Sequence, residues 1–211
     1  RVLFRSATLR REGALPWERA RPMLVQLLAA LQAAHEHGVI HRDMKPENVF
    51  RISRMGSDDF LKVFDFGIAK VLLGDDGNPA KPLTIEGQIL GTPAYMSPEQ
   101  CLGDPVDARS DLYAVGIIAY EMVTGRPPFE GKETSKLLYD QVYSRVPDMS
   151  QVAPAEVKID RRVEQLVRKA LEKDRDERYA TAQEFAEALL AGETSSSGLL
   201  PMLRGLFRRK K

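Results

Sequence analysis

A polar segment, His41–Asn48, separates a long helical pattern from two short strand-like runs, and this order restricts the possible folds more than any other part of the chain. The helical pattern spans Trp17–His37, where apolar residues recur at intervals of three and four. The strand-like runs are Val49–Ile52 and Leu61–Phe64, and the turn-forming residues of Ser53–Asp59 join them into a predicted hairpin. The polar segment is therefore expected where a long helix meets a hairpin.

Helical patterns dominate the rest of the chain. The first helix is expected to begin at Pro16 and to end near Gly38, which suits a left-handed helix end. A buried helix is predicted from Leu112 onward, ending before Gly125. Further helices are predicted over Thr134–Tyr143, Arg161–Leu171 and Thr181–Leu190, and a loop over residues 74–82. With so few strands, the chain is expected to have an α+β fold that is mainly helical.

The charge balance argues against a nucleic-acid partner. Thirty-one basic and thirty acidic residues leave a net charge of +1, so no overall field attracts a polyanion. The single cysteine, Cys101, cannot form an internal disulfide, which fits the reducing cytoplasm. No apolar stretch approaches the roughly 20 residues that a bilayer span requires. We therefore expect a cytoplasmic, globular protein that does not bind nucleic acid.

The polar segment and the end of the second strand-like run together contain the groups that phosphoryl transfer needs. Such a site requires a carboxylate to deprotonate a hydroxyl, oxygen ligands for magnesium, and a cation for the γ-phosphate. Asp43, Asn48 and Asp65 can supply the oxygens, and Lys45 can supply the cation. An ordinary charged surface loop is the alternative interpretation of each residue taken alone.

The sequence resembles the eukaryotic-type serine/threonine protein kinases of bacteria over about residues 8 to 191. The motifs that carry the resemblance are, in order, His41–Asn48, Asp65–Gly67, Gly91–Glu99, Asp107–Gly116 and Asp174–Tyr179. Ser97 replaces the alanine that is usual in the third motif. The resemblance implies the fold of a kinase C-terminal lobe, with a short β-hairpin at the active site.

The resemblance also implies roles for individual residues. Asp43 would be the catalytic base, and Lys45 would contact the γ-phosphate of ATP. Asn48 and Asp65 would hold Mg²⁺ on the ATP phosphates. Phe50 would form the floor of the adenine pocket. The acceptors would be Ser or Thr hydroxyls of protein substrates, because a lysine two residues after the catalytic aspartate is typical of the serine/threonine branch.

Three further residues have supporting roles in the resemblance. Asp111 is expected to hydrogen-bond the backbone of the turn that contains His41, which would fix the catalytic base. Glu99 and Arg178 are expected to form a buried ion pair. Removing one partner of such a pair would leave the other charge buried and uncompensated.

Regulation by phosphorylation is a separate expectation. Arg42 precedes the catalytic aspartate, and in the family this arginine pairs with a phosphorylated activation segment. Thr84 is the candidate phosphosite, because a phosphate there could order the loop against the guanidinium. Thr92 is a weaker candidate, since its hydroxyl is expected to lie near Asp43 and Lys45.

The predicted domain organisation has three parts. Residues 1–6 resemble a non-native leader, residues 7–191 correspond to the kinase C-terminal lobe, and residues 192–211 form a Ser-rich linker and a basic, apolar tail. No Gly-x-Gly-x-x-Gly loop and no Val-Ala-Ile-Lys strand lie upstream of Arg42. Without the small lobe, the 211 residues are expected to be inactive by themselves.

Three alternatives stay open from the sequence. The tail could bind anionic membrane, precede a membrane span, or be a solvated end. A pseudokinase that acts as a scaffold would require a defect in the small lobe, because the catalytic residues named above are intact. A small-molecule phosphotransferase shares a related lobe, but such enzymes generally lack the Asp65–Gly67 triplet.

Overall fold

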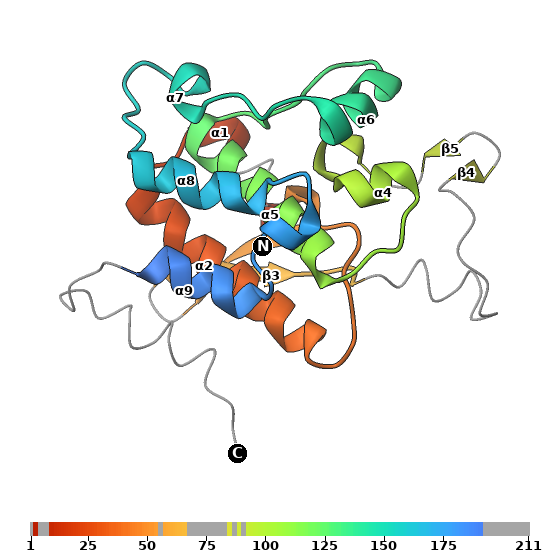
Figure 1. Ribbon diagram of the computed structural model, residues 1–211. Helices are drawn as coiled ribbons and strands as arrows, with labels where there is room; N and C mark the ends of the chain where they lie inside the picture. Colours follow the sequence, from red (N-terminus) through yellow and green to blue (C-terminus); the bar gives the residue numbers. More distant parts are fainter. Residues whose placement is uncertain are drawn as a thin grey trace.

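The computed structural model describes residues 2–3, 9–54, 57–66, 84–85, 88–89 and 92–191, and every structural statement below concerns these residues. Helices pack around one central helix, and a small antiparallel sheet lies against another long helix, as Figure 1 shows. The predicted fold class, α+β and mainly helical, is confirmed.

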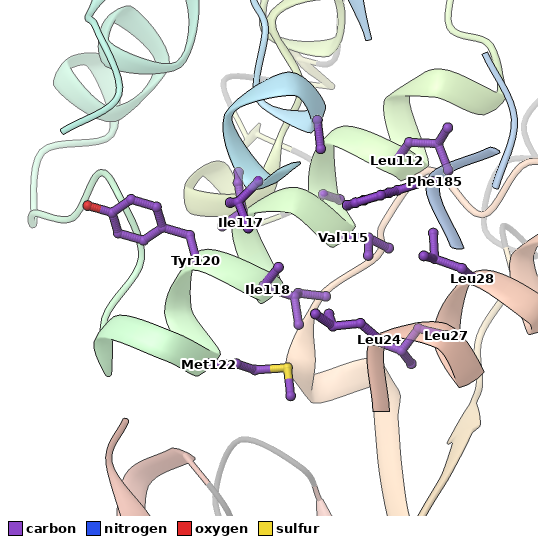
Figure 2. Packing of buried hydrophobic residues seen from close by; sticks show 14 of the residues in the cluster. Leu24, Leu27, Leu28, Leu112, Val115, Ile117, Ile118, Tyr120, Met122 and Phe185 are labelled. Carbon is purple, nitrogen blue, oxygen red and sulfur yellow. The ribbon is translucent and has the colours of Figure 1, made fainter. Parts of the chain in front are cut away.

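Two helices, α2 (Trp17–His35) and α5 (Ala108–Thr124), form the centre of the core. Side chains on every face of α5 are buried, as expected for a helix surrounded by protein. Leu24 of α2 lies beside Ile118 of α5, and Phe185 packs at the far end of the same cluster (Figure 2). Truncating one such buried leucine to alanine typically costs roughly 2–5 kcal/mol.

Local chemistry fixes the ends and the packing of α5. At its start, the Asp107 side chain accepts a hydrogen bond from the backbone N–H two residues later, at 2.8 Å. At its end, Gly125 adopts a left-handed conformation with φ of 84°. Gly116 lets α8 (Arg161–Ala170) approach closely, because a Cβ atom there would lie 2.9 Å from the Cβ atom of Ala170.

The sheet contains the strands β1 (Val2–Leu3), β2 (Val49–Arg54) and β3 (Ser57–Val63) in the order β1-β2-β3. All pairs are antiparallel, and Val49 lies opposite Val63. Both hairpin strands extend further toward the turn than the sequence predicted. Apart from Phe60, the extra residues are polar, so the strand-like hydrophobic pattern did not reveal them.

Polar contacts fasten the hairpin to α2. The side-chain amide of Gln26 donates to the carbonyl of Asp59 at 3.1 Å and accepts from the N–H of Leu61 at 3.0 Å. These are the backbone groups that a further strand would pair with, so the amide substitutes for a neighbouring strand. Arg19 adds two hydrogen bonds to the Asp59 carboxylate, at 2.7 and 3.0 Å. The hairpin is therefore held in place relative to the core.

The remaining elements are short. They are α1 (Arg10–Glu12), α4 (Pro98–Leu102), α6 (Thr134–Tyr143), α7 (Met149–Val152), α9 (Ala182–Leu190), the 3-10 helices η2 (Pro46–Asn48), η3 (Pro93–Tyr95) and η4 (Arg175–Glu177), and the strands β4 (Thr84–Ile85) and β5 (Gln88–Ile89). In Figure 1, α4 and α6 lie side by side. None of the described helices has the length and apolar character to cross a membrane.

The predicted helices are present, with ends that differ by at most two residues, except that α5 begins at Ala108, four residues before the predicted start. Helix α6 spans the predicted residues, and α9 begins one residue later because Thr181 is its N-cap. Helix α2 ends at His35, and Pro16 precedes it as the N-cap, with an extended ψ of 142°, rather than opening its first turn. The loop predicted at residues 74–82 lies outside the described residues.

Candidate active site

A single buried carboxylate anchors the polar loop to α5. Asp111 is 1% exposed and accepts the backbone N–H of His41 and that of Arg42, each at 2.8 Å. A third donor, Nε2 of His35, reaches the same carboxylate at 2.8 Å from the end of α2. The backbone hydrogen bonds expected for Asp111 are thus present in the structure. Three donors on one carboxylate hold the loop, α2 and α5 together.

The backbone of Arg42 explains how one carboxylate can accept two successive N–H groups. Its φ of 66° is left-handed, which is uncommon for a residue with a Cβ atom. A left-handed residue turns neighbouring N–H groups toward the same side of the chain and forms a concave anion-binding turn. On the other side, the carbonyl of Arg42 accepts from Nε2 of Gln100 in α4 at 2.6 Å. The loop is therefore fixed by its backbone.

The His41 imidazole joins the loop to the end of the hairpin. Its Nδ1 atom accepts the N–H of Asp43 at 3.3 Å, so we assign the ring proton to Nε2, which donates to the carbonyl of Phe64 at 2.9 Å. The ring centroid also lies 4.9 Å from that of Phe66. The fully buried His41 thus connects the segment before Asp43 with the segment around Asp65.

The Asp43 carboxylate is oriented by two neighbours. Lys45 Nζ donates to Oδ2 of Asp43 at 2.7 Å. Asn48 Nδ2 donates to the backbone carbonyl of Asp43 at 2.8 Å and to Oδ2 at 3.3 Å. Within the described residues, Oδ1 of Asp43 has no hydrogen-bond partner. The side chain is 42% exposed, so one oriented carboxylate oxygen is accessible to another molecule.

Asn48 and Asp65 are brought together by the backbone of the hairpin. The N–H of Phe64 donates to the carbonyl of Asn48 at 2.9 Å, and Asp65 follows with a left-handed φ of 56°. Since the Asn48 nitrogen is used on Asp43, its amide oxygen is the atom left for a cation. Amide and carboxylate oxygens are ligands that Mg²⁺ prefers, so this donor set fits that ion. In the described ranges, no group of three His, Cys, Asp or Glu side chains could hold a metal.

The ion pair between Glu99 and Arg178 is almost completely buried. Arg178 Nη1 and Nη2 donate to the two oxygens of Glu99 at 2.8 and 2.9 Å, and the Ser110 hydroxyl also donates to Glu99. Arg178 further donates to the carbonyls of Glu172, Lys173 and Arg109, so its five N–H groups all have acceptors. This is the buried pair that the sequence predicted.

Comparison with known proteins decides the family. The chain matches the model of the protein kinase domain over residues 3–190. The chain belongs to the protein kinase family. It is 44% identical over 167 residues to serine/threonine-protein kinase Pkn1 of Myxococcus xanthus, covering 79% of this chain and 23% of Pkn1. It is 43% identical over 183 residues to pkn3 of the same organism, covering 87% of this chain and 33% of pkn3.

A relative from another bacterium gives the same result. The probable serine/threonine-protein kinase PknB of Bifidobacterium longum is 42% identical over 178 residues, covering 84% of this chain and 24% of PknB. The kinase chain therefore spans about a quarter to a third of the length of these relatives.

For three other predicted site residues, the described part of the structure shows few or none of the expected contacts. Phe50 is half-buried on β2, with its ring centroid 4.7 Å from that of Phe64. Thr84 lies in β4 opposite Ile89, and its side chain is outside the described part of the structure. No hydrogen bond among the described residues joins the Thr92 hydroxyl to Asp43 or Lys45, so the expected contact is not shown. Gly67 lies outside the described residues.

Two residues that position the loop containing Asp43 were not predicted from the sequence. His35 lies at a helix end without a metal-binding pattern, and its partner Asp111 is 76 positions away. Gln100 carries no charge, and it reaches the Arg42 carbonyl from 58 positions away. No local pattern marks contacts at such separations, so only the three-dimensional structure reveals them.

The kinase is expected to lose stability in acid through Glu99. Burial raises the pKa of Glu99, but the hydrogen bonds and charge of Arg178, with the Ser110 hydroxyl, outweigh this and lower it from 4.5 to about 2. A carboxylate with a lowered folded-state pKa stabilises the fold above its unfolded pKa and loses that contribution as pH falls toward its folded pKa. The shift corresponds to about 3 kcal/mol, lost between about pH 4.5 and pH 2.

Urea unfolding between pH 6 and pH 3 would test this expectation. Other carboxylates also titrate there, so the difference between wild type and Glu99→Gln isolates the Glu99 contribution. We expect this difference in unfolding free energy to shrink as pH falls below 4.5. A difference that stays constant with pH would contradict the assignment.

Proposed function

We propose that the protein transfers the γ-phosphate of Mg-ATP to serine or threonine hydroxyls of other proteins. The observation that carries the proposal is the accessible Asp43 carboxylate, which Lys45 and Asn48 orient through one oxygen while the other is unpartnered among the described residues. Membership of the protein kinase family supports the same chemistry and favours it over small-molecule phosphotransfer.

The geometry suggests a role for each group. Oδ1 of Asp43 would accept the proton of the substrate hydroxyl as that oxygen bonds to the γ-phosphorus and the bond to the leaving ADP oxygen breaks. Lys45 would neutralise charge on the transferred group. The oxygens of Asn48 and Asp65 would hold Mg²⁺, which when bound offsets charge on the phosphates. Phe50 would contribute to the adenine pocket.

Regulation and location follow as parts of the proposal. Arg42 would bind a phosphate on Thr84 in the segment before α4, with Thr92 as the weaker candidate phosphosite. Ordering of this segment would then complete the peptide-binding surface. We place the protein in the cytoplasm, with membrane association through residues 192–211 or through a span in the full-length protein as alternatives. Partners would be proteins with Ser or Thr acceptors, and not nucleic acids.

The second candidate function is a pseudokinase scaffold. The described catalytic residues carry no defect, so the decision depends on the small lobe. We expect the full-length gene product to transfer labelled phosphate from Mg-ATP to a serine or threonine peptide, and to lose this activity when the metal is chelated. For the 211-residue chain alone we expect no transfer and no magnesium-dependent ATP binding by calorimetry at millimolar nucleotide. A full-length protein that binds ATP without transferring phosphate would support the scaffold instead.

A further inference from the structure

One buried amide connects α6 to the turn that precedes α4. Gln141 is fully buried, and its Nε2 atom donates to the carbonyls of Pro93 and Ala94 at 3.2 and 2.8 Å. Its Oε1 atom accepts from the hydroxyl of Tyr113 in α5 at 2.8 Å. Both hydrogens and the oxygen of the amide are therefore used. An apolar residue would occupy this buried position at a lower desolvation cost. The hydrogen bonds of the amide are therefore the reason for a glutamine here.

The orientation of this amide is fixed by a relay of hydrogen bonds. Lys173 donates to the Tyr113 hydroxyl at 3.3 Å, and to the carbonyls of Asp140 and Gln141 at 3.2 and 2.7 Å. Because the Tyr113 oxygen accepts from Lys173, its single hydrogen is directed to the Gln141 oxygen. The amide nitrogen must then face the carbonyls of η3. The amide is thus set in one orientation by residues from α5 and from the segment after α8.

The turn that Gln141 holds is a neighbour of the Asp43 loop. It runs from η3 (Pro93–Tyr95) into the capping box of α4, in which Ser97 and Gln100 bond each other. The same Gln100 side chain donates to the carbonyl of Arg42, the residue before Asp43. On its other side, Tyr95 donates to the buried Glu121 carboxylate at 2.5 Å. The turn therefore lies beside the loop that would hold the acceptor hydroxyl.

We propose that Gln141 is a positioning residue for the protein substrate, because it fixes a turn that continues into α4 and is joined through Gln100 to the loop containing Asp43, where the acceptor segment would lie. This inference rests on the proposed kinase function and adds a residue in α6 to its substrate site. Gln141 would not contact ATP or the reacting atoms. Its loss should therefore weaken peptide binding while nucleotide binding stays the same.

The test uses the full-length kinase and a serine peptide that the wild type phosphorylates. In Gln141→Leu, two carbonyls lose their donor and the Tyr113 hydroxyl loses its acceptor. We expect the KM for the peptide to rise about tenfold, while the KM for ATP stays within about twofold. Tyr113→Phe keeps the ring and removes only the relay, so we expect a rise of about threefold in the same KM. The matched control is Gln151→Leu at an exposed position in α7, which should change neither constant.

Each outcome has a distinct meaning. If the wild type transfers phosphate and Gln141→Leu leaves the peptide KM unchanged, the inference is wrong although the proposed function stands. Equal rises in the KM for peptide and for ATP would indicate general damage and would also overturn it. If Gln141→Leu does not fold, as shown by its melting curve, Tyr113→Phe decides the question alone. A wild type without transfer activity refutes the proposed function, and the inference with it.

Discussion

Replacing Asp43 by asparagine in the full-length kinase is expected to lower kcat by roughly 10²- to 10⁴-fold. Asparagine has nearly the same size and can still accept a hydrogen bond from Lys45 through its carbonyl oxygen. It cannot take up a proton at neutral pH, so the substrate hydroxyl would lose its general base. The loop should keep its shape, because Asp111 holds it through backbone N–H groups rather than through the Asp43 side chain.

The division between kcat and KM makes this prediction specific. Asp43 is not among the proposed magnesium ligands, so the KM for ATP should change little. The matched control is Asp104→Asn, an exposed aspartate after α4, which should leave both constants unchanged. Steady-state assays with melting curves for all three proteins provide the measurement. A kcat for Asp43→Asn equal to that of wild type would show that another group is the base.

The largest expected effect on stability comes from Arg178. Its guanidinium is buried, bonds both oxygens of Glu99, and lies 4.8 Å from the ring centroid of Tyr113. In Arg178→Met, the Glu99 carboxylate stays buried without its cation and three backbone carbonyls lose a donor. We expect the free energy of unfolding of the 211-residue chain to fall by about 3–5 kcal/mol.

A second substitution identifies the origin of this loss. If the uncompensated charge is responsible, Arg178→Met combined with Glu99→Gln should be more stable than Arg178→Met alone. Arg161→Met, at an exposed position that begins α8, is the matched control and should change stability by at most about 0.5 kcal/mol. Urea unfolding at pH 7 gives the four values. A loss for Arg178→Met no larger than that of the control would contradict a structural role for the pair.

The helices could be predicted because their signals are local. Apolar residues at helical spacing and the cap residues Thr181 and Gly125 define α9 and the end of α5 within a few positions. The outer ends of the hairpin could not be predicted in this way. In β3, Gln26 and Arg19 of α2 hydrogen-bond Asp59, and such a contact depends on packing between distant parts of the chain.

The candidate site shows the same difference between local and distant information. The residues around Asp43 and Asp65 were found because they lie in two compact motifs that resemble the kinase family. Their supports are distributed over α2, α4 and α6. The His35 side chain contributes one hydrogen bond, and the Gln100 and Gln141 side chains contribute three each. These residue types are common in proteins. Neither residue type nor spacing separates them from ordinary helix residues.

The left-handed backbones of Arg42 and Asp65 have a consequence for how this lobe can be engineered. Each left-handed residue with a Cβ atom costs roughly 1–2 kcal/mol, a strain that glycine would avoid. Selection of variants for thermal resistance alone would therefore favour glycine at both positions. Those variants would lack the guanidinium proposed to bind the phosphorylated segment and one of the two proposed magnesium ligands. A library screened for heat tolerance should keep these two positions fixed, because here the more durable protein would be the poorer catalyst.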